Sequence, residues 1–523
     1  MLAAQQLQGF YLGYRQQSLR RVYLLSRHYV MIKILIAISI LFVPVSVDAY
    51  SFSNEQAVSA GQEKNLTFNS PDISLHAQKI EMTLGDAIYL GLRNNRAIRS
   101  AYLNRISQKF DLTVSQDRFN PKLTLSGNYL ATYNQDDRYR QGAVSPKTTI
   151  LTPYGSRVSL GWNYINTKAN MAGFSTNDGA SITVIQPLLR GAGKNIATAP
   201  VRLAQLSEQI NRLNLKSIIS QTVTGSITSY RALLQAQEQL KIARESLNRS
   251  HKLVDVNRAM IAAGRMAEFE IVQAEAEVAS QELNFEQARN DLDAKRLELL
   301  QLLSLDLNTP IEATESLQAH DTKVDVVQAI KQAEYSQPQW LIKLIENEQA
   351  NIDLAVAHNN SQWDVSLVGG ANQVRRRDNQ SGVSRTWENY VGIQVEIPVN
   401  DMSIHQAEVQ ARVNVRNSGI QLAEAHQQLE REVTNAVRDI NARWRQYEIS
   451  QRARDLSLRK LEIEREKLTV GRSSNFQVLS YENDLRNAEN ARLNTLINYL
   501  NAQAELDQQL GTTLQSWDIT IND

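Results

Sequence analysis

The sequence contains no cysteine, and this absence excludes several kinds of chemistry. Without thiols the chain can form no disulfide, offers no thiolate nucleophile, and cannot hold an iron–sulfur cluster or a cysteine-based zinc site. An excess of charge is also lacking, because 56 Lys and Arg residues stand against 55 Asp and Glu residues. No basic surplus is available to displace counterions, so we expect no nucleic acid partner. Aromatic residues are scarce, at 7% of 523, which disfavours a helical membrane transporter.

Motifs for catalysis and for binding metal or phosphate are missing as well. The seven histidines are scattered, and neither His-Glu-x-x-His nor Gly-x-Ser-x-Gly occurs, so zinc and serine hydrolase chemistry have no candidate residues. The segment Gly191-Ala192-Gly193-Lys194 faintly suggests a phosphate loop, but Leu188 stands where the Walker spacing requires glycine. We therefore expect no enzyme activity, no cofactor and no bound metal.

Long apolar runs are scarce too, and the most apolar stretch, residues 34–47, contains Pro44. This stretch is too short to span a bilayer comfortably as a helix. It follows Lys33 and ends in Val47-Asp48-Ala49, whose small residues suit a cleavage site after Ala49. Residues 1–49 are therefore predicted to be a signal peptide with an over-long N-terminal extension, and Met31 is the better initiator. A short buried core helix is the alternative, which the position and the flanks disfavour.

Proline is absent between Pro200 and Pro310 and again after Pro398. Within these spans the apolar residues recur at alternating three- and four-residue steps, which is typical of helices with a narrow apolar seam, as in coiled coils. The pattern predicts a helix over Val201–Met260 of about 90 Å and another over Ile404–Val470 of about 100 Å. Both helices are amphipathic, because Gln, Asn, Arg and Glu fill their other faces.

Each long helix is followed by a glycine turn, and the two turns are spaced like a repeat. Gly264 and Gly471 are 207 residues apart, as are Phe269 and Phe476. Glycine at the C′ position of a helix adopts the left-handed conformation without a Cβ clash, so both turns are predicted to close helical hairpins.

Matching segments extend this repeat along the chain. The predicted helix N-termini at Thr83 and Asp325 match at an offset of 242 residues. Pro187 and Pro398, further along each copy, match at an offset of only 211 residues. The first copy therefore contains an insert of 242 − 211 = 31 residues. The predicted organisation is a signal peptide with its extension (1–49), a mature N-terminal segment (50–82), a first repeat (83–303), a linker (304–324), a second repeat (325–510) and a C-terminal tail (511–523).

Between the helices of each copy lies a region where apolar and polar residues alternate. In the second copy, residues 363–398 predict a hairpin in which Val391, Ile393 and Val395 share one face, with a polar loop holding the Arg375–Arg377 cluster. Such strands are half buried in protein or half exposed to lipid. A soluble β-sandwich gives the same pattern, but the signal peptide and the small number of strands favour lipid.

In the first copy the strand region covers residues 121–187. Leu123–Tyr133 and Ser181–Pro187 are its outer strands, and two strand-like pieces lie between them, around Lys147–Leu151 and Gly155–Ile165. These pieces form either an extra barrel hairpin or a long extracellular loop. A strand number that returns the chain to its starting side must be even, so three strands are excluded.

The order of these features resembles that of the TolC-like outer-membrane factors, over nearly all of the mature chain. The resemblance rests on Leu84-x-x-Ala87-Ile88-x-x-Gly91-Leu92-x-Asn94-Asn95, on the corners Asn120-Pro121-Lys122-Leu123 and Gln186-Pro187-Leu188-Leu189-Arg190-Gly191, and on the paired Gly-Arg turns. It implies a mainly α fold with a β-barrel part: long coiled-coil helices form a trimeric α-barrel tunnel, and β-hairpins are contributed to a shared outer-membrane β-barrel. A homotrimer in outer-membrane lipid, without a cofactor, is the implied assembly.

The same resemblance implies roles for the two turns. A periplasmic adaptor, or membrane fusion protein, of an inner-membrane pump would dock at the tips, for which the candidates are Gly264, Arg265, Gly471 and Arg472. The tunnel would narrow nearby, at Glu270, Gln477 and Ser480. The family often has aspartates where Gln477 and Ser480 stand, and Glu270 alone keeps a carboxylate. Other glutamates near Glu270 are interpreted as a solvated helix face.

The predicted function is therefore a passive exit duct of a tripartite efflux or type I secretion system. It would sit in the outer membrane, with its tunnel extending into the periplasm. The alternative is a secreted periplasmic coiled-coil adaptor or structural protein without a pore. That alternative explains the long helices and the signal peptide, but not two alternating hairpins at equal points of a duplication.

Overall fold

The structure is a computed structural model that describes residues 79–133, 138–171, 173–378, 382–399 and 401–521. The description below concerns the compact unit that begins at Leu75. The predicted signal peptide and nearly all of the segment 50–82 lie outside the described residues. Among the helices that are described, none has both the length and the apolar composition needed to cross a membrane.

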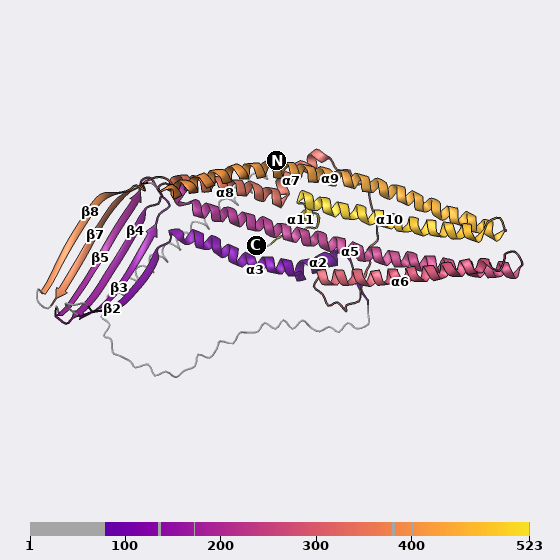
Figure 1. Ribbon diagram of the computed structural model, residues 1–523, viewed down its shortest axis with the longest axis horizontal. Coiled ribbons are helices and arrows are strands. Elements are labelled where there is room, and N and C mark those ends of the chain that lie inside the picture. Colours follow the sequence, from indigo (N-terminus) through magenta and orange to yellow (C-terminus); the bar gives the residue numbers. More distant parts are fainter. Residues whose placement is uncertain (1–78, 134–137, 172, 379–381, 400, 522–523) are drawn as a thin grey trace, which may run out of the picture. The chain divides into compact units, whose positions relative to one another are not determined.

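Two very long helices organise this unit (Figure 1). The helix α5 (Ala199–Ala262) has 64 residues and α9 (Met402–Thr469) has 68, as the uninterrupted apolar seams predicted. Pro200 lies in the first turn of α5, where a missing N–H costs no hydrogen bond. The other helices are α2 (Leu84–Asn94), α3 (Arg96–Gln116), α4 (Lys194–Ala197), α6 (Glu270–Leu302), α7 (Val326–Ser336), α8 (Pro338–Asn360), α10 (Asn475–Leu510), α11 (Thr513–Ser516) and the 3-10 turn η2 (Asp117–Phe119).

Capping residues begin the first helix of each repeat where the sequence predicted. The Thr83 hydroxyl accepts a hydrogen bond from the Asp86 N–H at 3.2 Å, and the Thr83 N–H donates to the Asp86 carboxylate at 3.0 Å. The Thr83 hydroxyl also donates to this carboxylate at 2.6 Å, and the bonds that the carboxylate accepts from the Thr83 hydroxyl and from the Thr83 N–H lower the pKa of Asp86 below its usual value. In the second repeat, Asp325 accepts from the Gln328 N–H at 3.2 Å. The N-termini of both helices are therefore set by local hydrogen bonds of their capping residues.

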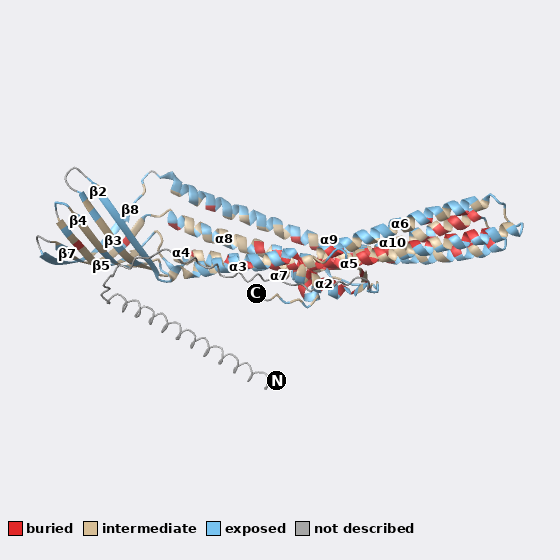
Figure 2. Ribbon diagram, turned by 90° about the horizontal axis from the view of Figure 1, so that it is seen from below, coloured by how far each residue is buried: buried red, intermediate tan, exposed pale blue. Residues whose placement is uncertain are grey.

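Two large buried clusters are centred on the long helices, one on α5 and one on α9, and the buried residues (red in Figure 2) gather along the helices. In the first, α5 packs against α2 and α6, and the fully buried Tyr230 donates its hydroxyl to the Met82 carbonyl at 2.9 Å. Met82 belongs to β1 (Ile80–Met82), which pairs in parallel with β6 (Ile311–Ala313). In the second, Tyr499 of α10 packs with Val433 and Val437 of α9. The two cores are consistent with a duplicated chain.

The helix α3 contributes few residues to the buried core and is held to α5 by polar contacts. Arg105 of α3 is buried and donates two hydrogen bonds to the Glu208 carboxylate of α5, at 2.7 and 2.6 Å. A bidentate pair of this kind fixes both distance and orientation. It places α3 beside α5, and the chain then passes from α3 through η2 into the sheet.

Six antiparallel strands form one sheet in the order β2-β3-β4-β5-β7-β8. They are β2 (Lys122–Tyr133), β3 (Arg138–Leu151), β4 (Arg157–Ala169), β5 (Gly173–Pro187), β7 (Asp364–Asp378) and β8 (Gly382–Glu396). The first repeat thus gives four strands and the second gives two. The two strand-like pieces of the first copy belong to β3 and β4, an extra hairpin within the sheet, and the strand number in that copy is even.

One expectation for the second hairpin is wrong. The Arg375–Arg377 cluster does not lie in a polar loop but inside β7, which continues to Asp378. The reason is the partner strand: β5 extends equally far, and its Asp178 lies opposite Arg375, with the Arg375 Nε 3.3 Å from the carboxylate. Cross-strand pairing therefore keeps three consecutive arginines in a strand that their charge alone disfavours.

The register gives the sheet one apolar and one polar face. Leu123, Leu160 and Ile182 share a row on one face, and Val158, Val184 and Val391 share the next. We call this the apolar face; its exposed members are Leu123, Leu125, Leu160, Trp162, Ile182, Val184, Leu367, Val391, Ile393 and Val395, and Val391 is 83% exposed. The opposite, polar face carries Thr124, Ser126, Ser159, Asn163, Ser181, Thr183, Asn372 and Gln394.

Candidate functional site at the helical turns

Both predicted glycine turns have the same backbone geometry. Gly264 follows α5 with φ +67°, and Gly471 follows α9 with φ +73°. In each turn the N–H two residues past the helix cap bonds back into the last turn: Arg265 to the Met260 carbonyl and Arg472 to the Lys467 carbonyl, both at 2.8 Å. These are Schellman motifs, and the left-handed glycines that the sequence predicted are confirmed.

The two turns present matching exposed side chains. Arg265 and Arg472, which follow the glycines, are exposed. Phe269 is 74% exposed and Phe476 is 65% exposed, although phenylalanine usually lies buried. Each turn therefore offers one guanidinium and one aromatic ring, a combination that is enriched at protein interfaces.

The three predicted constriction residues lie just beyond the turns. Glu270 is the first residue of α6, whereas Gln477 and Ser480 lie in the first two turns of α10, and all three are half-buried. The Gln477 N–H donates to the capping hydroxyl of Ser474 at 3.2 Å, so its backbone position is fixed. Their proposed role in narrowing a tunnel stays a prediction.

A buried pair of asparagines joins the two hairpins near the turns, and sequence reasoning missed it. Asn257 of α5 and Asn475 of α10 are fully buried, and the Asn257 amide donates to the Asn475 side-chain oxygen at 2.9 Å. The Asn475 amide donates in turn to the Glu270 carbonyl at 3.3 Å. We call these three groups the asparagine lock. The available signal was a polar Asn257 on the seam that follows Leu253 and Val254.

Further from the turns, a cluster of charges joins the same helices. The Arg249 guanidinium of α5 lies 3.0 Å from Glu482 and 3.4 Å from Glu489, both on α10. Arg465 of α9 also contacts Glu482. Burial raises the pKa of Glu489, while Arg249 opposes that shift. Leu253, Leu461, Leu468 and Val478 pack between the lock and this cluster, so the hairpins are held by apolar and polar contacts together.

Metal chemistry has no candidate among the described residues, which contain no group of three or more His, Asp or Glu side chains placed to hold an ion. The site is a set of packing and hydrogen-bonding contacts between two helical hairpins. Each hairpin belongs to its own repeat, and the two meet where α10 packs against α5 and α6.

Paired helical hairpins, joined through long helices to one antiparallel sheet, are also the fold of solved outer membrane channels. Solved structures with this fold match the chain at low sequence identity. The CmeC outer membrane channel of Campylobacter jejuni is 16% identical, with a TM-score of 0.62 over 82% of this chain and 86% of that one. The open state of the MtrE outer membrane channel of Neisseria gonorrhoeae is also 16% identical, with a TM-score of 0.63 over 82% and 89%.

The outer membrane protein VceC of Vibrio cholerae is 14% identical, with a TM-score of 0.62 over 82% of this chain and 96% of that chain. No family model matches the sequence, and no curated protein does. The resemblance predicted from the sequence is therefore confirmed for the fold, which joins long α-helices to a β-sheet.

Proposed function

We propose that this protein is the outer-membrane exit duct of a tripartite efflux or type I secretion system and that it exports substrates passively. The observation that carries the proposal is the exposed apolar face of the sheet. A soluble protein rarely leaves a contiguous apolar surface of this kind in water. The fold it shares with outer membrane channels supports the same conclusion.

The dimensions of the apolar face suit a bilayer. From Trp387 to Val395 along β8 there are eight residue steps, or about 26 Å of strand. At the tilt of about 40° usual in barrels, this corresponds to a band about 20 Å tall, close to the apolar band of outer-membrane barrels. Trp162, Tyr129 and Trp387 add aromatic rings to this face, where such barrels place aromatic girdles.

The two open edges of the chain explain why copies must assemble. The strands β2 and β8 end the sheet, and unpaired strand edges are not tolerated in lipid. The helix α3, which leads into β2, exposes Leu103, Ile106, Phe110 and Val114, and α9, which follows β8, exposes Val409, Val413 and Ile420. The exposed edges of the sheet and the exposed apolar helices that continue from them therefore lie on the same two sides of the chain. A head-to-tail ring would cover both edges of every copy, and a homotrimer is the ring that we propose.

Cysteine cross-linking tests this ring cleanly, because the chain has no cysteine of its own. Phe110 lies six residues from the end of α3 and Val409 seven residues from the start of α9, so both are about 10 Å from the sheet ends of their helices. We expect the double variant Phe110→Cys with Val409→Cys to form disulfide-linked dimers and trimers in outer-membrane fractions. Pairing Phe110→Cys with Ile463→Cys is the matched control and should stay monomeric on a denaturing gel; equal ladders in both would contradict the ring.

In this proposal the turns are the periplasmic tips. A periplasmic adaptor would dock at Gly264, Arg265, Gly471 and Arg472, and an inner-membrane pump would supply the energy. The exposed Phe269 and Phe476 support such docking, because most of each aromatic side chain remains open to a partner. Export needs no catalysis here: the hairpins twist apart when the adaptor binds, and the tunnel opens past Glu270, Gln477 and Ser480.

Single-channel recording of the detergent-extracted mature chain tests the duct itself. We expect long-lived discrete conductance steps in a planar bilayer, and we expect Glu270→Gln to change their size if that carboxylate lines the narrowest part. Trimers that insert but stay silent would indicate tips that remain closed without an adaptor. A protein that neither inserts nor forms trimers would instead support the periplasmic coiled-coil alternative.

A further inference from the structure

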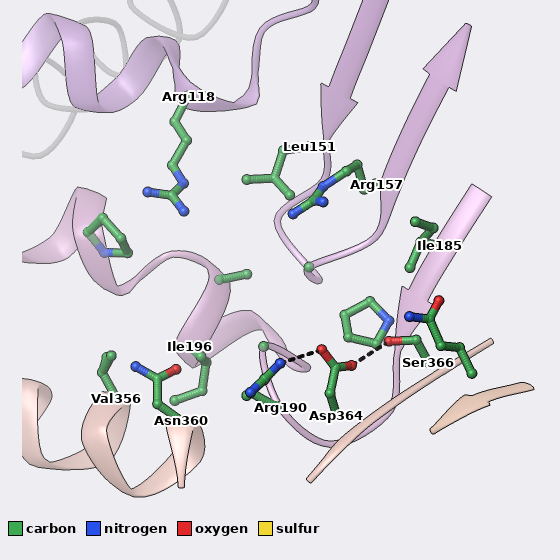
Figure 3. Close-up of a pocket in the computed structure, with 16 residues that line it drawn as sticks. Arg118, Leu151, Arg157, Ile185, Arg190, Ile196, Val356, Asn360, Asp364 and Ser366 are labelled. Carbon is green, nitrogen blue, oxygen red and sulfur yellow. Dashed lines mark hydrogen bonds and ion pairs between the residues drawn. The ribbon is translucent and has the colours of Figure 1, made fainter. Parts of the chain in front are cut away.

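A pocket of about 460 Å³ lies where the sheet meets the helices, at the end opposite to the turns along α5 (Figure 3). Its wall combines the start of β4, the start of β7, the end of α8 and the turn η2. Three arginines line it, Arg118, Arg157 and Arg190, against a single carboxylate, Asp364. The pocket therefore carries an excess of two positive charges.

The carboxylate is already engaged by its neighbours. The Arg190 guanidinium donates to one Asp364 oxygen at 2.7 Å, and the Ser366 hydroxyl donates to the other at 2.9 Å. Arg118 and Arg157 reach into the pocket from two other sides (Figure 3), and neither forms a salt bridge within the part of the chain that the structure describes, although Arg157 is near enough to Asp364 to interact with it electrostatically. The charge excess thus belongs to these two guanidinium groups.

Both arginines are held in place by local backbone structure. The turn before Arg157 is closed by the Thr152 N–H, which donates to the Ser156 carbonyl at 2.9 Å. This turn packs so closely on the next loop that a Cβ on Gly155 would lie 2.2 Å from the Gly191 carbonyl oxygen. Arg118 lies in η2, and the neighbouring Asp117 is paired with Lys122, so that carboxylate is engaged as well.

The register assigns the pocket to the polar face of the sheet. Arg157 lies opposite Leu151 on one side and Ile185 on the other, and this row belongs to the same face as Ser159 and Thr183. In a barrel whose apolar face meets lipid, the polar face lines the interior. The pocket then opens to the duct and not to the membrane.

We propose that Arg118 and Arg157 form an oxyanion-binding site on the inner wall of the duct, which takes solutes that bear carboxylate or phosphate groups. This inference rests on the proposed function for the direction that the pocket faces. A guanidinium binds such groups through two parallel hydrogen bonds. The side-chain amides of Asn360 and Gln394, which also line the pocket, supply further donors. Repeated around a ring of copies, the site enriches anions where the barrel joins the tunnel.

Reversal potentials in a potassium chloride gradient test the site in the assembled channel. We expect the double variant Arg118→Gln with Arg157→Gln to lower the permeability ratio of chloride to potassium on the order of two- to tenfold, with a larger effect at 0.1 M than at 1 M salt. Arg385→Gln removes the same type of charge from the opposite face, since Arg385 pairs with Arg375 on the apolar side. The ratio should stay unchanged in that control. Channels of normal conductance with equal ratios in wild type and double variant would overturn the site and leave the duct intact.

Binding of inorganic pyrophosphate to the detergent-solubilised protein tests the site without a channel. We expect a saturable rise in the unfolding temperature of the wild type and of Arg385→Gln, and at least a tenfold weaker midpoint for the double variant. Equal midpoints in all three proteins would contradict the site whether or not the protein conducts. Failure to conduct, with pyrophosphate binding lost only in the double variant, would instead count against the proposed function.

Discussion

Replacing Asn475 with alanine is expected to shift the tips strongly toward the open state. In the proposed mechanism the two hairpins must separate, and the asparagine lock must then break. The substitution leaves the Asn257 amide and the Glu270 carbonyl without their partner in a buried place. An unsatisfied buried group costs about 1–3 kcal/mol, which corresponds to a shift in the closed-to-open ratio of about 5- to 150-fold.

Conductance and antibiotic entry both report this shift. Asn475→Ala channels should spend more time at high conductance, and cells that carry them should become sensitive to large antibiotics that the outer membrane normally excludes. Val272→Ala is the matched control, because Val272 lies on α6 two residues after Glu270, is 65% exposed and takes no part in the asparagine lock. A closed, antibiotic-resistant Asn475→Ala channel would mean that the lock does not hold the tips.

The second large effect is expected at Gly511, which ends α10. Its φ is +71°, and a Cβ there would lie 2.4 Å from the Ser336 carbonyl oxygen and 2.8 Å from the Gln337 nitrogen. All of these are backbone atoms at the corner between α7 and α8, so a side chain cannot be accommodated by a rotamer change. Left-handed strain and overpacking together predict a loss of about 2–5 kcal/mol for Gly511→Ala.

Gly264→Ala separates strain from crowding in the same measurement. Gly264 has a similar φ, but its Cβ would meet no atom within 4 Å. Only left-handed strain remains there, or about 1–2 kcal/mol. The temperature at which trimers dissociate on a gel should therefore fall much further for Gly511→Ala than for Gly264→Ala. Equal decreases would show that the corner at Ser336 yields more easily than its geometry implies.

The helices and their turns could be predicted because their signals are local. Apolar residues at three- and four-residue steps, without proline, specify α5 and α9, and a glycine past each end is sufficient to close the turn. The extra hairpin was harder, because Pro146 lies inside β3, and proline normally argues against an interior strand. Pairing with β2 on one side, where Pro146 lies opposite Leu125, nevertheless keeps that segment in the sheet.

The contacts between hairpins could not be predicted, because they depend on which helix faces meet. Asn257 and Asn475 are 218 residues apart, and each alone resembles an ordinary polar residue on a long helix. The arginine pocket has the same origin, since η2, β4 and α8 bring Arg118 and Arg157 together from separate parts of the chain. The spacing of residues within one helix carries no information about which residues of other helices or strands they will contact.

Six strands per copy have a consequence for the traffic through the outer membrane. Three copies would give 3 × 6 = 18 strands, and a barrel of that number is about 35 Å across at its backbone. A pore of such width cannot exclude small molecules, so the β-barrel itself would let them pass through the outer membrane. The whole task of keeping toxic compounds out would then fall on a few buried side chains at the far end of the helices. The asparagine lock, the charges around Arg249 and the apolar contacts between them would together decide whether small molecules leak into the cell.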